Sequence, residues 1–185
     1  LAALAVGRAP RQAAGEFPAS LLRLRRAGGY PAPMRIAVSS DHAAVAERLH
    51  LVAALQAAGH EVDDLGGPEG VAVDYPEPAA AVAHAVAEGR ADRGVLLCGT
   101  GIGVCIAANK VHGIRAATVH DEFTAEMARR HNNANVVCLG ARLLAAAAIT
   151  RIVERFLDTD FDGGRHATRV DKIMALEAPE RAADA

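Results

Sequence analysis

A thiol stands at the mouth of a glycine-rich turn in residues 96–110, LLCGTGIGVCIAANK. Gly99, Gly101 and Gly103 follow Cys98 at a spacing of two, and glycine permits positive φ angles and a close approach of the backbone to a bound group. A helix that begins near residue 101 would direct unpaired N–H groups and its positive dipole end at that group. The turn is therefore predicted to hold negative charge, either a phosphate or a reaction intermediate.

Neither of the two common phosphate-binding glycine motifs fits this turn. The dinucleotide motif GxGxxG would need glycine at position 104, which is Val104, while Gly103 lies one place early. A P-loop would need Ser or Thr after its lysine, but Val111 follows Lys110. The choice between a bound phosphate and a reaction intermediate therefore depends on Cys98.

Cys98 is a group that could create such charge. A thiol has a reference pKa of about 8.5, which a helix N-terminus or a cationic neighbour lowers to roughly 3.5–7.5, a range useful to a general base. Such a base could remove a proton from carbon, and each N–H donor around the resulting enediolate is worth on the order of a hundredfold in rate. The competing interpretation is a small buried strand residue, which the apolar surroundings favour for Cys105 and Cys138.

The bulk composition indicates one domain that acts on a small molecule. The chain has 185 residues, enough for a single sizeable core. Its 20 basic and 22 acidic side chains give a formal charge of −2, so no charge excess favours nucleic acid or an acidic membrane surface. No apolar run approaches the roughly 20 residues that span a bilayer. Three cysteines without CxxC spacing are typical of free thiols in a reducing cytosol, so a cytoplasmic location is expected.

The two ends of the chain differ in composition from the part between them. Residues 1–33 carry five arginines and a single acidic residue in an Ala- and Pro-rich sequence, and Met34 opens the first apolar run. We expect residues 1–33 to be a disordered N-terminal extension, residues 34–177 to form the catalytic domain, and residues 178–185 to be a flexible tail.

From Arg35 onward, short β-branched runs alternate with longer Ala- and Leu-rich amphipathic stretches. This alternation predicts βαβ units and a three-layer α/β/α sandwich around a Rossmann-like, five-stranded parallel sheet. Strands are expected at residues 35–40, 61–66, 94–98, 115–120 and 135–139, and helices at residues 43–58, 76–88, 101–111, 122–131, 143–157 and 165–177. Ligands of such sheets bind beyond the carboxyl ends of the strands, where this pattern places Asp41, Cys98 and Arg142.

Four motifs occur in order along this domain: SSDHAA, LLCGTGIGVCIAANK, RRHNNANVVCLGAR and GGRHATRVDKI. Together they closely resemble the ribose-5-phosphate isomerase B / galactose-6-phosphate isomerase family of sugar-phosphate isomerases, over about residues 34–177. The resemblance implies interconversion of an aldose phosphate and a ketose phosphate without metal or cofactor, most often ribose 5-phosphate and ribulose 5-phosphate in the pentose phosphate pathway. It also implies a homodimer or a dimer of dimers with a small-molecule sugar phosphate as the partner.

The resemblance assigns roles at the glycine turn. Cys98 occupies the place of the base that moves a proton between C2 and C1, and Thr100 that of a hydroxyl that assists transfer between the sugar oxygens. For Thr100 a helix cap is a compatible second role. Members without this cysteine use a Glu inside the turn, where this chain has Val104. The other turn residues are expected to bind substrate: Gly99, Gly101, Ile102 and Gly103.

Asp41 and His42 follow the first strand, where the family uses Asp at the sugar ring and hydroxyls and His near the phosphate. A helix cap is the alternative role for Asp41. Ala44 stands where the family commonly has Gly, which crowds the first helical turn. Residues 66–74, after the second strand, are expected to form part of the rim of the site.

His131 matches the family histidine that opens the sugar ring, and Asn132 lies beside it. A cyclic sugar phosphate must open before its C2 proton becomes acidic, and an imidazole near the ring oxygen can assist. The helix that ends at His131 is expected to run back towards the amino edge of the sheet, away from Cys98. We therefore expect His131 to reach the site of a neighbouring subunit, which makes the dimer a catalytic requirement.

Arg165 and Arg169 lie four residues apart on one face of the last expected helix, and Lys172 extends this stripe. Two guanidiniums at this spacing can hold a phosphate through charge-assisted hydrogen bonds, and the family places its phosphate-binding arginines here. Arg142, after the fifth strand, is a third candidate. A solvated basic face is the competing interpretation.

Other functions fit parts of the pattern. Isomerisation of another four- to six-carbon sugar phosphate would use the same residues. A nucleotide-binding α/β module would cradle a phosphate in the turn and use Asp121 to accept a ribose hydroxyl. A non-catalytic partner subunit is a third possibility, against which the presence of Cys98, Thr100 and His131 together argues. The sequence contains no HExxH motif or Cys/His cluster, so no metal site is expected.

Overall fold

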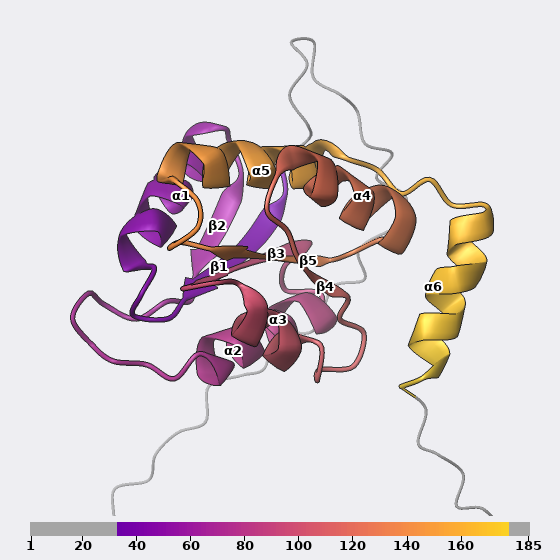
Figure 1. Cartoon of the computed structure of the whole chain (residues 1–185), viewed down its shortest axis with the longest axis horizontal. Coiled ribbons are helices and arrows are strands. Elements are labelled where there is room, and N and C mark those ends of the chain that lie inside the picture. Colours follow the sequence, from indigo (N-terminus) through magenta and orange to yellow (C-terminus); the bar gives the residue numbers. More distant parts are fainter. Residues whose placement is uncertain (1–32, 178–185) are drawn as a thin grey trace, which may run out of the picture.

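The computed structural model describes residues 33–177, and the expectations for residues 1–32 and 178–185 lie outside this range (Figure 1). Strands and helices alternate along the described chain. They are β1 (Arg35–Ser40), α1 (Val45–Ala57), β2 (Glu61–Asp64), α2 (Pro76–Ala87), β3 (Arg93–Cys98), α3 (Ile102–Ala108), β4 (Ala116–Thr118), α4 (Glu122–Asn132), β5 (Val136–Gly140), α5 (Ala146–Asp158) and α6 (Arg165–Ala175). The predicted order and kind of elements is confirmed.

The expected and observed elements differ at their ends. Strand β2 ends at Asp64 and β4 is three residues long, both shorter than expected. Helix α3 ends at Ala108, and the side chain of the next residue explains why. Asn109 donates from Nδ2 to the Ala116 carbonyl at 2.9 Å and accepts from the Ala116 N–H at 2.8 Å. This side chain thus pairs with the outer edge of β4 as a neighbouring strand would, which ties the end of α3 to the edge of the sheet.

The five strands form one parallel sheet in the order β2-β1-β3-β5-β4. From β1 the chain first adds β2 on one side and then crosses to place β3 on the other side. The order of strands therefore reverses between β1 and β3. In open parallel sheets, ligands bind outside the carboxyl ends of the strands at such a switch point.

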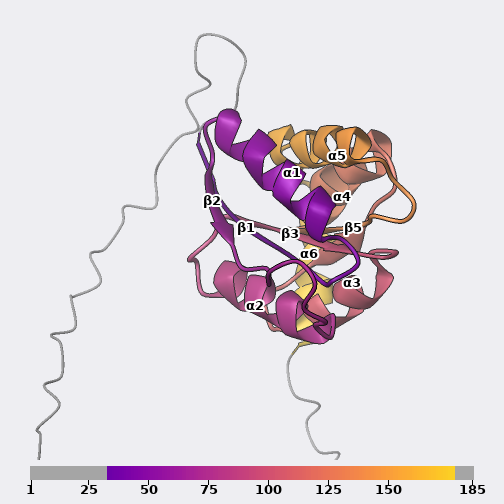
Figure 2. The ribbon, with the colours of Figure 1, turned by 90° about the vertical axis from the view of Figure 1, so that its left-hand side faces the viewer.

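Helices cover both faces of the sheet, as Figure 2 shows. Helices α1, α4 and α5 pack on one face over buried Val95 and Leu97, while α2 and α3 pack on the other face over Leu96 and Cys98. Because side chains alternate along a strand, Cys98 at the end of β3 faces the layer of α2 and α3. The predicted three-layer α/β/α sandwich is confirmed.

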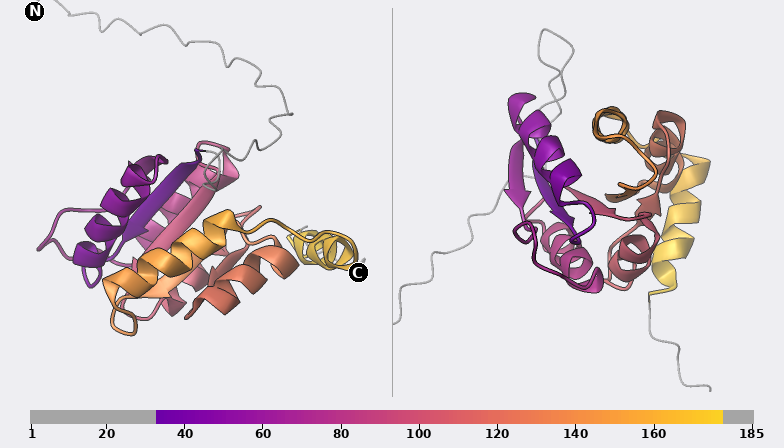
Figure 3. Two further views of the ribbon diagram at one scale, coloured as in Figure 1. Left: turned by 90° about the horizontal axis from the view of Figure 1, so that it is seen from above. Right: turned by 60° about the vertical axis from the view of Figure 1, so that its left-hand side comes forward.

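Helix α6 stands at the margin of the sandwich beside α4 (Figure 3). It is attached through its buried His166 and Val170, and through Met174, whose sulfur lies 3.2 Å from Arg115 Nη1. Arg165 and Arg169, at the amino end of the helix, are exposed. No helix among residues 33–177 is long and apolar enough to cross a membrane.

Candidate active site

A pocket of about 240 Å³ opens at the switch point between β1 and β3. Its walls come from the ends of β1, β3 and β5 and from the start of α2. The residues that line it are Asp41, His42, Ala43, Tyr75, Cys98, Gly99, Thr100, Gly103 and Arg142. Residues predicted to act in the site, from three separate motifs, are thus brought together in one pocket of one chain, and the observed switch point explains their meeting.

Cys98 is the last residue of β3 and is 5% exposed. Its Sγ accepts a hydrogen bond of 3.0 Å from the Gly101 N–H. Gly101 has a φ of +80°, a conformation that glycine adopts without strain and that carries the backbone back over the sulfur. The turn therefore places a backbone N–H directly against the Cys98 sulfur, at the wall of the pocket.

The end of β5 holds this turn in place. A Cβ added to Gly101 would lie 2.9 Å from the Leu139 carbonyl carbon, and one added to Gly140 would lie 2.8 Å from the Thr100 backbone. The Ala141 N–H also donates to the Cys98 carbonyl at 2.8 Å. Two glycines therefore allow the glycine-rich turn and the neighbouring strand end to touch backbone to backbone.

The same strand end delivers Arg142 to the pocket. Its N–H donates to the Gly99 carbonyl at 3.1 Å, and its guanidinium lies over Gly99, where an added Cβ would meet Nε at 3.2 Å. Arg142 lines the pocket and is exposed, so its guanidinium is available to an anion that enters the pocket. A positive charge beside the mouth of the turn is suited to a negatively charged substrate.

Asp41 and His42 project from the end of β1, which is tied to β3 by a hydrogen bond of 3.2 Å from the Asp41 N–H to the Leu97 carbonyl. Asp41 Oδ1 accepts from the Ala43 N–H at 2.9 Å, within its own loop. The residue before α1 is Ala44, and no side chain caps that helix, so Asp41 does not act as its N-cap. The Asp41 carboxylate is half-buried at the pocket wall, where a sugar hydroxyl could reach it.

Thr100, Gly101 and Ile102 occupy different places in the turn. The Thr100 hydroxyl is exposed to the pocket, and its only hydrogen bond within residues 33–177 is a long one of 3.4 Å from the Ile102 N–H. Gly101 is buried under Leu139, and its N–H donates to Cys98 Sγ. Ile102 is 54% exposed and lies outside the pocket lining, so this chain alone does not place it at the substrate.

The expected rim contributes two contacts that the sequence only partly indicated. The Val73 carbonyl lies 3.3 Å from His42 Nδ1, from which it can accept when that nitrogen carries the proton. Tyr75, which sequence analysis missed, packs its ring on the turn so closely that a Cβ on Gly103 would lie 2.9 Å from Cε2. The only signal for Tyr75 was its position directly after the stretch expected to form the rim.

A buried arginine, also missed, anchors this rim segment. Arg48 on α1 is 3% exposed, lies 3.3 Å from Asp64 Oδ1, and donates to the Gly67 carbonyl at 2.7 Å. Gly66 passes directly over the guanidinium, where any Cβ would collide with it. Arg48 thus fixes the start of the segment that ends at Tyr75.

The other predicted residues form a second cluster at the opposite edge of the sheet. His131, at the end of α4, stacks on His166 with ring centroids 4.3 Å apart and an interplanar angle of 3°. Arg165 Nε lies 3.4 Å from His166 Nε2, and Arg169 follows one turn later on the exposed face of α6. We call His131, Arg165, His166 and Arg169 the basic cluster.

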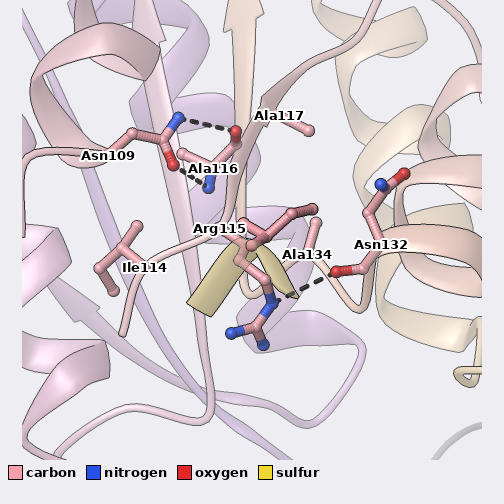
Figure 4. Close-up of a pocket in the computed structure, with 8 residues that line it drawn as sticks. Asn109, Ile114, Arg115, Ala116, Ala117, Asn132 and Ala134 are labelled. Atoms are coloured by element: carbon pink, nitrogen blue, oxygen red, sulfur yellow. Dashed lines mark hydrogen bonds between the residues drawn. The ribbon is translucent and has the colours of Figure 1, made fainter. Parts of the chain in front are cut away.

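Asn132 adjoins this cluster but lines a different cavity, of about 200 Å³ (Figure 4). Its carbonyl accepts from Arg115 Nε at 3.2 Å, and Asn109, Ala116 and Ile173 complete the cavity with neighbouring residues. The cavity lies along the edge strand β4, and neither Cys98 nor Asp41 contributes to it.

Within one chain, the basic cluster cannot reach the pocket of Cys98. The loop that follows α4 contacts the beginning of β3, where the Gly94 N–H donates to the Asn135 carbonyl at 2.9 Å. Cys98 lies four residues further along β3 than Gly94, and at about 3.3 Å per residue the two are roughly 13 Å apart. The structure therefore assigns the predicted residues to two separate locations.

The electrostatics of the basic cluster favour an anion. Burial lowers the pKa of His166, and the positive charges of His131, Arg165 and Arg169 lower it further. Exposed Asp162 lies beside the histidines, and its carboxylate also accepts from Arg130 Nε at 3.1 and 3.2 Å. Ligand atoms of His131, Asp162 and His166 lie within 4.8 Å of one another, a grouping that the sequence spacing did not reveal. The parallel rings do not direct their nitrogen lone pairs at one point, so this arrangement suits a metal ion poorly.

Asp121, the residue that a nucleotide-binding function would need, is used to cap a helix. Its carboxylate accepts from the Thr124 N–H at 2.7 Å and from the Thr124 hydroxyl at 2.8 Å, which completes a capping box at the start of α4. These hydrogen bonds lower the pKa of Asp121. Strand β5 separates β4, which precedes Asp121, from β3 and the glycine turn. This placement weighs against the nucleotide-binding alternative.

Comparison with known proteins gives a consistent set of relatives. The family model described as Ribose/Galactose Isomerase matches residues 36–173. D-erythrulose-4-phosphate isomerase of Pectobacterium atrosepticum is 44% identical over 149 residues, which cover 80% of this chain and 98% of that protein. Ribose-5-phosphate isomerase B of Escherichia coli is 41% identical over 143 residues, which cover 77% of this chain and 96% of that protein.

Solved structures agree with these relatives. Ribose-5-phosphate isomerase B of Clostridium thermocellum superimposes with a TM-score of 0.77 at 44% identity, over 78% of this chain and 97% of that one. The Mycoplasma genitalium enzyme with bound ribulose 5-phosphate superimposes with a TM-score of 0.75 at 43% identity, over 77% and 95% of the two chains. With its fold, its four motifs and the match over residues 36–173 in agreement, the chain belongs to the ribose/galactose isomerase family of sugar-phosphate isomerases.

Proposed function

We propose that the protein interconverts ribose 5-phosphate and ribulose 5-phosphate through an enediolate, without a metal ion, and that Cys98 is the general base. The observation that carries this proposal is the 3.0 Å hydrogen bond from the Gly101 N–H to Cys98 Sγ, in a pocket shared with Asp41, Thr100 and Arg142. It joins a proton acceptor to a turn that can stabilise negative charge.

The proposed reaction needs only proton transfers. Cys98 takes the proton from C2 of the open-chain aldose, and the electrons of that C–H bond form the C1–C2 double bond of the enediolate. The Thr100 hydroxyl moves a proton between the oxygens on C1 and C2. Cys98 then returns its proton to C1, which gives the ketose. Backbone N–H groups of the turn stabilise the oxyanion while it exists.

We further propose that each complete site is shared by two subunits of a homodimer. The pocket of one chain holds the base and a single arginine, Arg142, whereas Arg165 and Arg169 lie in the basic cluster at the far edge of the sheet. A second copy that presents its basic cluster to the pocket would bring two more guanidiniums to the phosphate and His131 to the ring oxygen. This division leaves the glycine turn for charge that forms during the reaction.

The relatives differ in the sugar phosphate for which they are named, and this difference concerns the choice of substrate in the proposal. One relative is named for a four-carbon sugar phosphate and another for a five-carbon one, at 44% and 41% identity. The alternative substrate, a tetrulose phosphate, would need the same base and the same phosphate site. The two differ in the distance between C2 and the phosphate.

The direct test is an isomerase assay with excess chelator. Purified protein is incubated with ribose 5-phosphate, with four-carbon and six-carbon sugar phosphates, and with no sugar, and formation of the isomeric sugar is followed. We expect the highest kcat/KM with ribose 5-phosphate. A higher value with the four-carbon sugar would assign the alternative substrate, and no turnover of any sugar phosphate would contradict the isomerase function itself.

A further inference from the structure

Two thiols outside the proposed mechanism lie where helix α3 packs on the sheet. Cys138 on β5 is in register with Thr118 on β4, and residues paired in a parallel sheet point to the same face. The Thr118 hydroxyl donates to the Gly101 carbonyl at 3.2 Å, so that face is the one covered by α3. Cys105 is on α3, and its sulfur reaches down to the Ala116 carbonyl of β4 at 3.3 Å. Cys105 packs against the buried cluster that contains Cys138, and each of the two thiols shifts the pKa of the other.

The two sulfurs have unequal environments. Cys138 is fully buried, and this burial raises its pKa well above the usual value. Cys105 is half-buried, and a hydrogen bond from the Cys138 thiol lowers its pKa to about 6, assisted by Thr118 and Asn109 and opposed by burial. Asn109 Nδ2 lies 3.6 Å from the Cys105 sulfur, on the side exposed to solvent.

This pairing has the arrangement of a redox-active pair. Thiols that react with peroxides are ionised, partly accessible and often close to a second thiol that resolves the oxidised form. We propose that Cys105 is a site of oxidation by hydrogen peroxide or another hydroperoxide, and that Cys138 resolves the product as an intramolecular disulfide. Cys98 takes no part in this bridge.

The proposed chemistry has two steps. The Cys105 thiolate attacks the peroxide, which breaks the O–O bond, oxidises the sulfur to a sulfenic acid by two electrons and releases hydroxide. The Cys138 sulfur then attacks the sulfenic sulfur and displaces the second hydroxide, which leaves as water with the Cys138 proton. Together, two thiols and one hydrogen peroxide give one disulfide and two waters.

The bridge would act on the catalytic turn because Cys105 is one helical turn away from it. The Cys105 N–H donates to the Gly101 carbonyl at 3.3 Å, and Gly101 supplies the N–H to Cys98. A disulfide would fix the two sulfurs about 2.05 Å apart and so draw α3 towards β5. Because Gly101 already touches the Leu139 backbone, we expect the turn to shift and activity to fall reversibly.

The test uses the whole protein, reduced, freed of reductant and exposed to hydrogen peroxide. Trypsin leaves Cys98 and Cys105 together in peptide 94–110, so the bridge is assigned in the Cys98→Ala variant, where Cys105 and Cys138 are the remaining thiols. We expect a loss of two mass units, a cross-linked pair of peptides, and full reversal by dithiothreitol. The rate of thiol loss should rise with pH around a midpoint near 6.

Two variants separate the steps. In Cys138→Ala, or in Cys138→Ser if the first folds poorly, a dimedone adduct should form on Cys105. In Cys105→Ser, Cys138 should stay reduced. In the protein with all three thiols, peroxide should leave Cys98 free to alkylation while activity falls, and dithiothreitol should restore both thiols and activity. Oxidation of Cys98 before Cys105, or a bridge that contains Cys98, would overturn the proposal, as would a Cys105 that resists peroxide. Each readout of the bridge is independent of which sugar is isomerised.

Discussion

The backbone N–H of Gly101 points at the sulfur of Cys98, 3.0 Å away, because a φ of +80° turns the chain back at the start of α3. The contact links the two halves of the motif seen in the sequence. The glycine provides a conformation in which an amide faces the end of β3, and the cysteine provides the sulfur that accepts its hydrogen bond. The same turn therefore holds the proposed base and surrounds the place where the oxyanion would form.

Replacement of Cys98 by alanine tests whether this sulfur is the base. We expect exchange of the C2 proton with solvent to fall by at least ~10²–10⁴-fold, the usual contribution of a general base. Binding of the sugar phosphate should persist, because the proposed phosphate contacts come from arginines. Exchange is measured by NMR in deuterated water, and binding by calorimetry. Cys105→Ser, which changes a thiol outside the pocket, is the control, and retained exchange in Cys98→Ala would remove Cys98 from this role.

The sequence predicted the edge of the sheet where the pocket lies, for a simple reason. Strand ends can be read from alternating polarity, and all parallel strands deliver the residues that follow them to one edge. Local patterns are therefore sufficient to group Asp41, Cys98 and Arg142. The switch point that brings Asp41 beside Cys98 depends on the order of strands, which local patterns do not contain.

The contacts that were missed depend on tertiary packing. In the sequence, Arg48 looks like one more basic residue of an amphipathic helix. Its partners are found only in the fold, where residues 64–67 pass over its guanidinium. The stacking of His131 on His166 likewise joins the end of one helix to the start of another, 35 positions further along the chain. Neither spacing matches a helix or strand period, so neither contact leaves a periodic signal in the sequence.

Mixed dimers test whether sites are shared between subunits. A Cys98→Ala subunit retains its basic cluster, and a His131→Ala subunit retains its base. If each complete site draws Cys98 from one chain and His131 from the other, a mixed dimer contains one intact site. We expect each variant alone to have little activity, and mixtures that exchange subunits to recover up to about half the activity per mixed dimer.

Mass spectrometry of differently labelled subunits shows whether mixed dimers form. The control is a double variant that carries Cys98→Ala and His131→Ala in one chain, mixed with the His131→Ala subunit. This mixture contains no chain with an intact basic cluster, so it should recover nothing. If mixed dimers of the two single variants form but recover no activity, that result would contradict the shared site.

Arg48 should affect substrate binding through the rim segment. In Arg48→Met the side chain keeps its approximate length but loses its contacts with Asp64 and the Gly67 carbonyl, which are worth ~2 kcal/mol or more for a charged donor. We expect residues 65–75 to become more mobile, so that KM rises several-fold. The value of kcat should change less, because Cys98 lies on β3, whereas the rim segment follows β2. Arg48→Lys should recover part of the binding.

The matched control is Arg151→Met, which removes an exposed pair between Arg151 and Glu122. Exposed pairs contribute little, so neither KM nor the free energy of unfolding should change by much. Steady-state kinetics and urea unfolding are measured on all three variants. A loss of stability in Arg48→Met with an unchanged KM would show that Arg48 supports the fold alone and does not position the rim.

Two glycines can separate the effect of close packing between the glycine-rich turn and β5 from the effect of backbone strain. Gly101 and Gly113 have φ angles of +80° and +83°, so alanine at either position costs roughly 1–2 kcal/mol in backbone conformation. A Cβ at Gly113 meets nothing within 4 Å, whereas a Cβ at Gly101 lies 2.9 Å from the Leu139 carbonyl carbon. Gly101→Ala should therefore lose a further ~1–3 kcal/mol of unfolding free energy, since overpacking forces the backbone to shift.

The two alanine variants should also differ in activity. Gly113→Ala changes a loop at the amino edge of the sheet and should leave kcat close to that of the unchanged protein. Gly101→Ala must either rotate the amide away from Cys98 Sγ or displace the end of β5, which is hydrogen-bonded to the Cys98 carbonyl, and either movement disturbs the position of the sulfur in the turn. We expect its kcat to fall by more than tenfold, measured at a temperature where urea unfolding shows the variant to be folded. Equal losses of stability and activity in the two variants would mean that the close packing of Gly101 on Leu139 is not what holds the base in place.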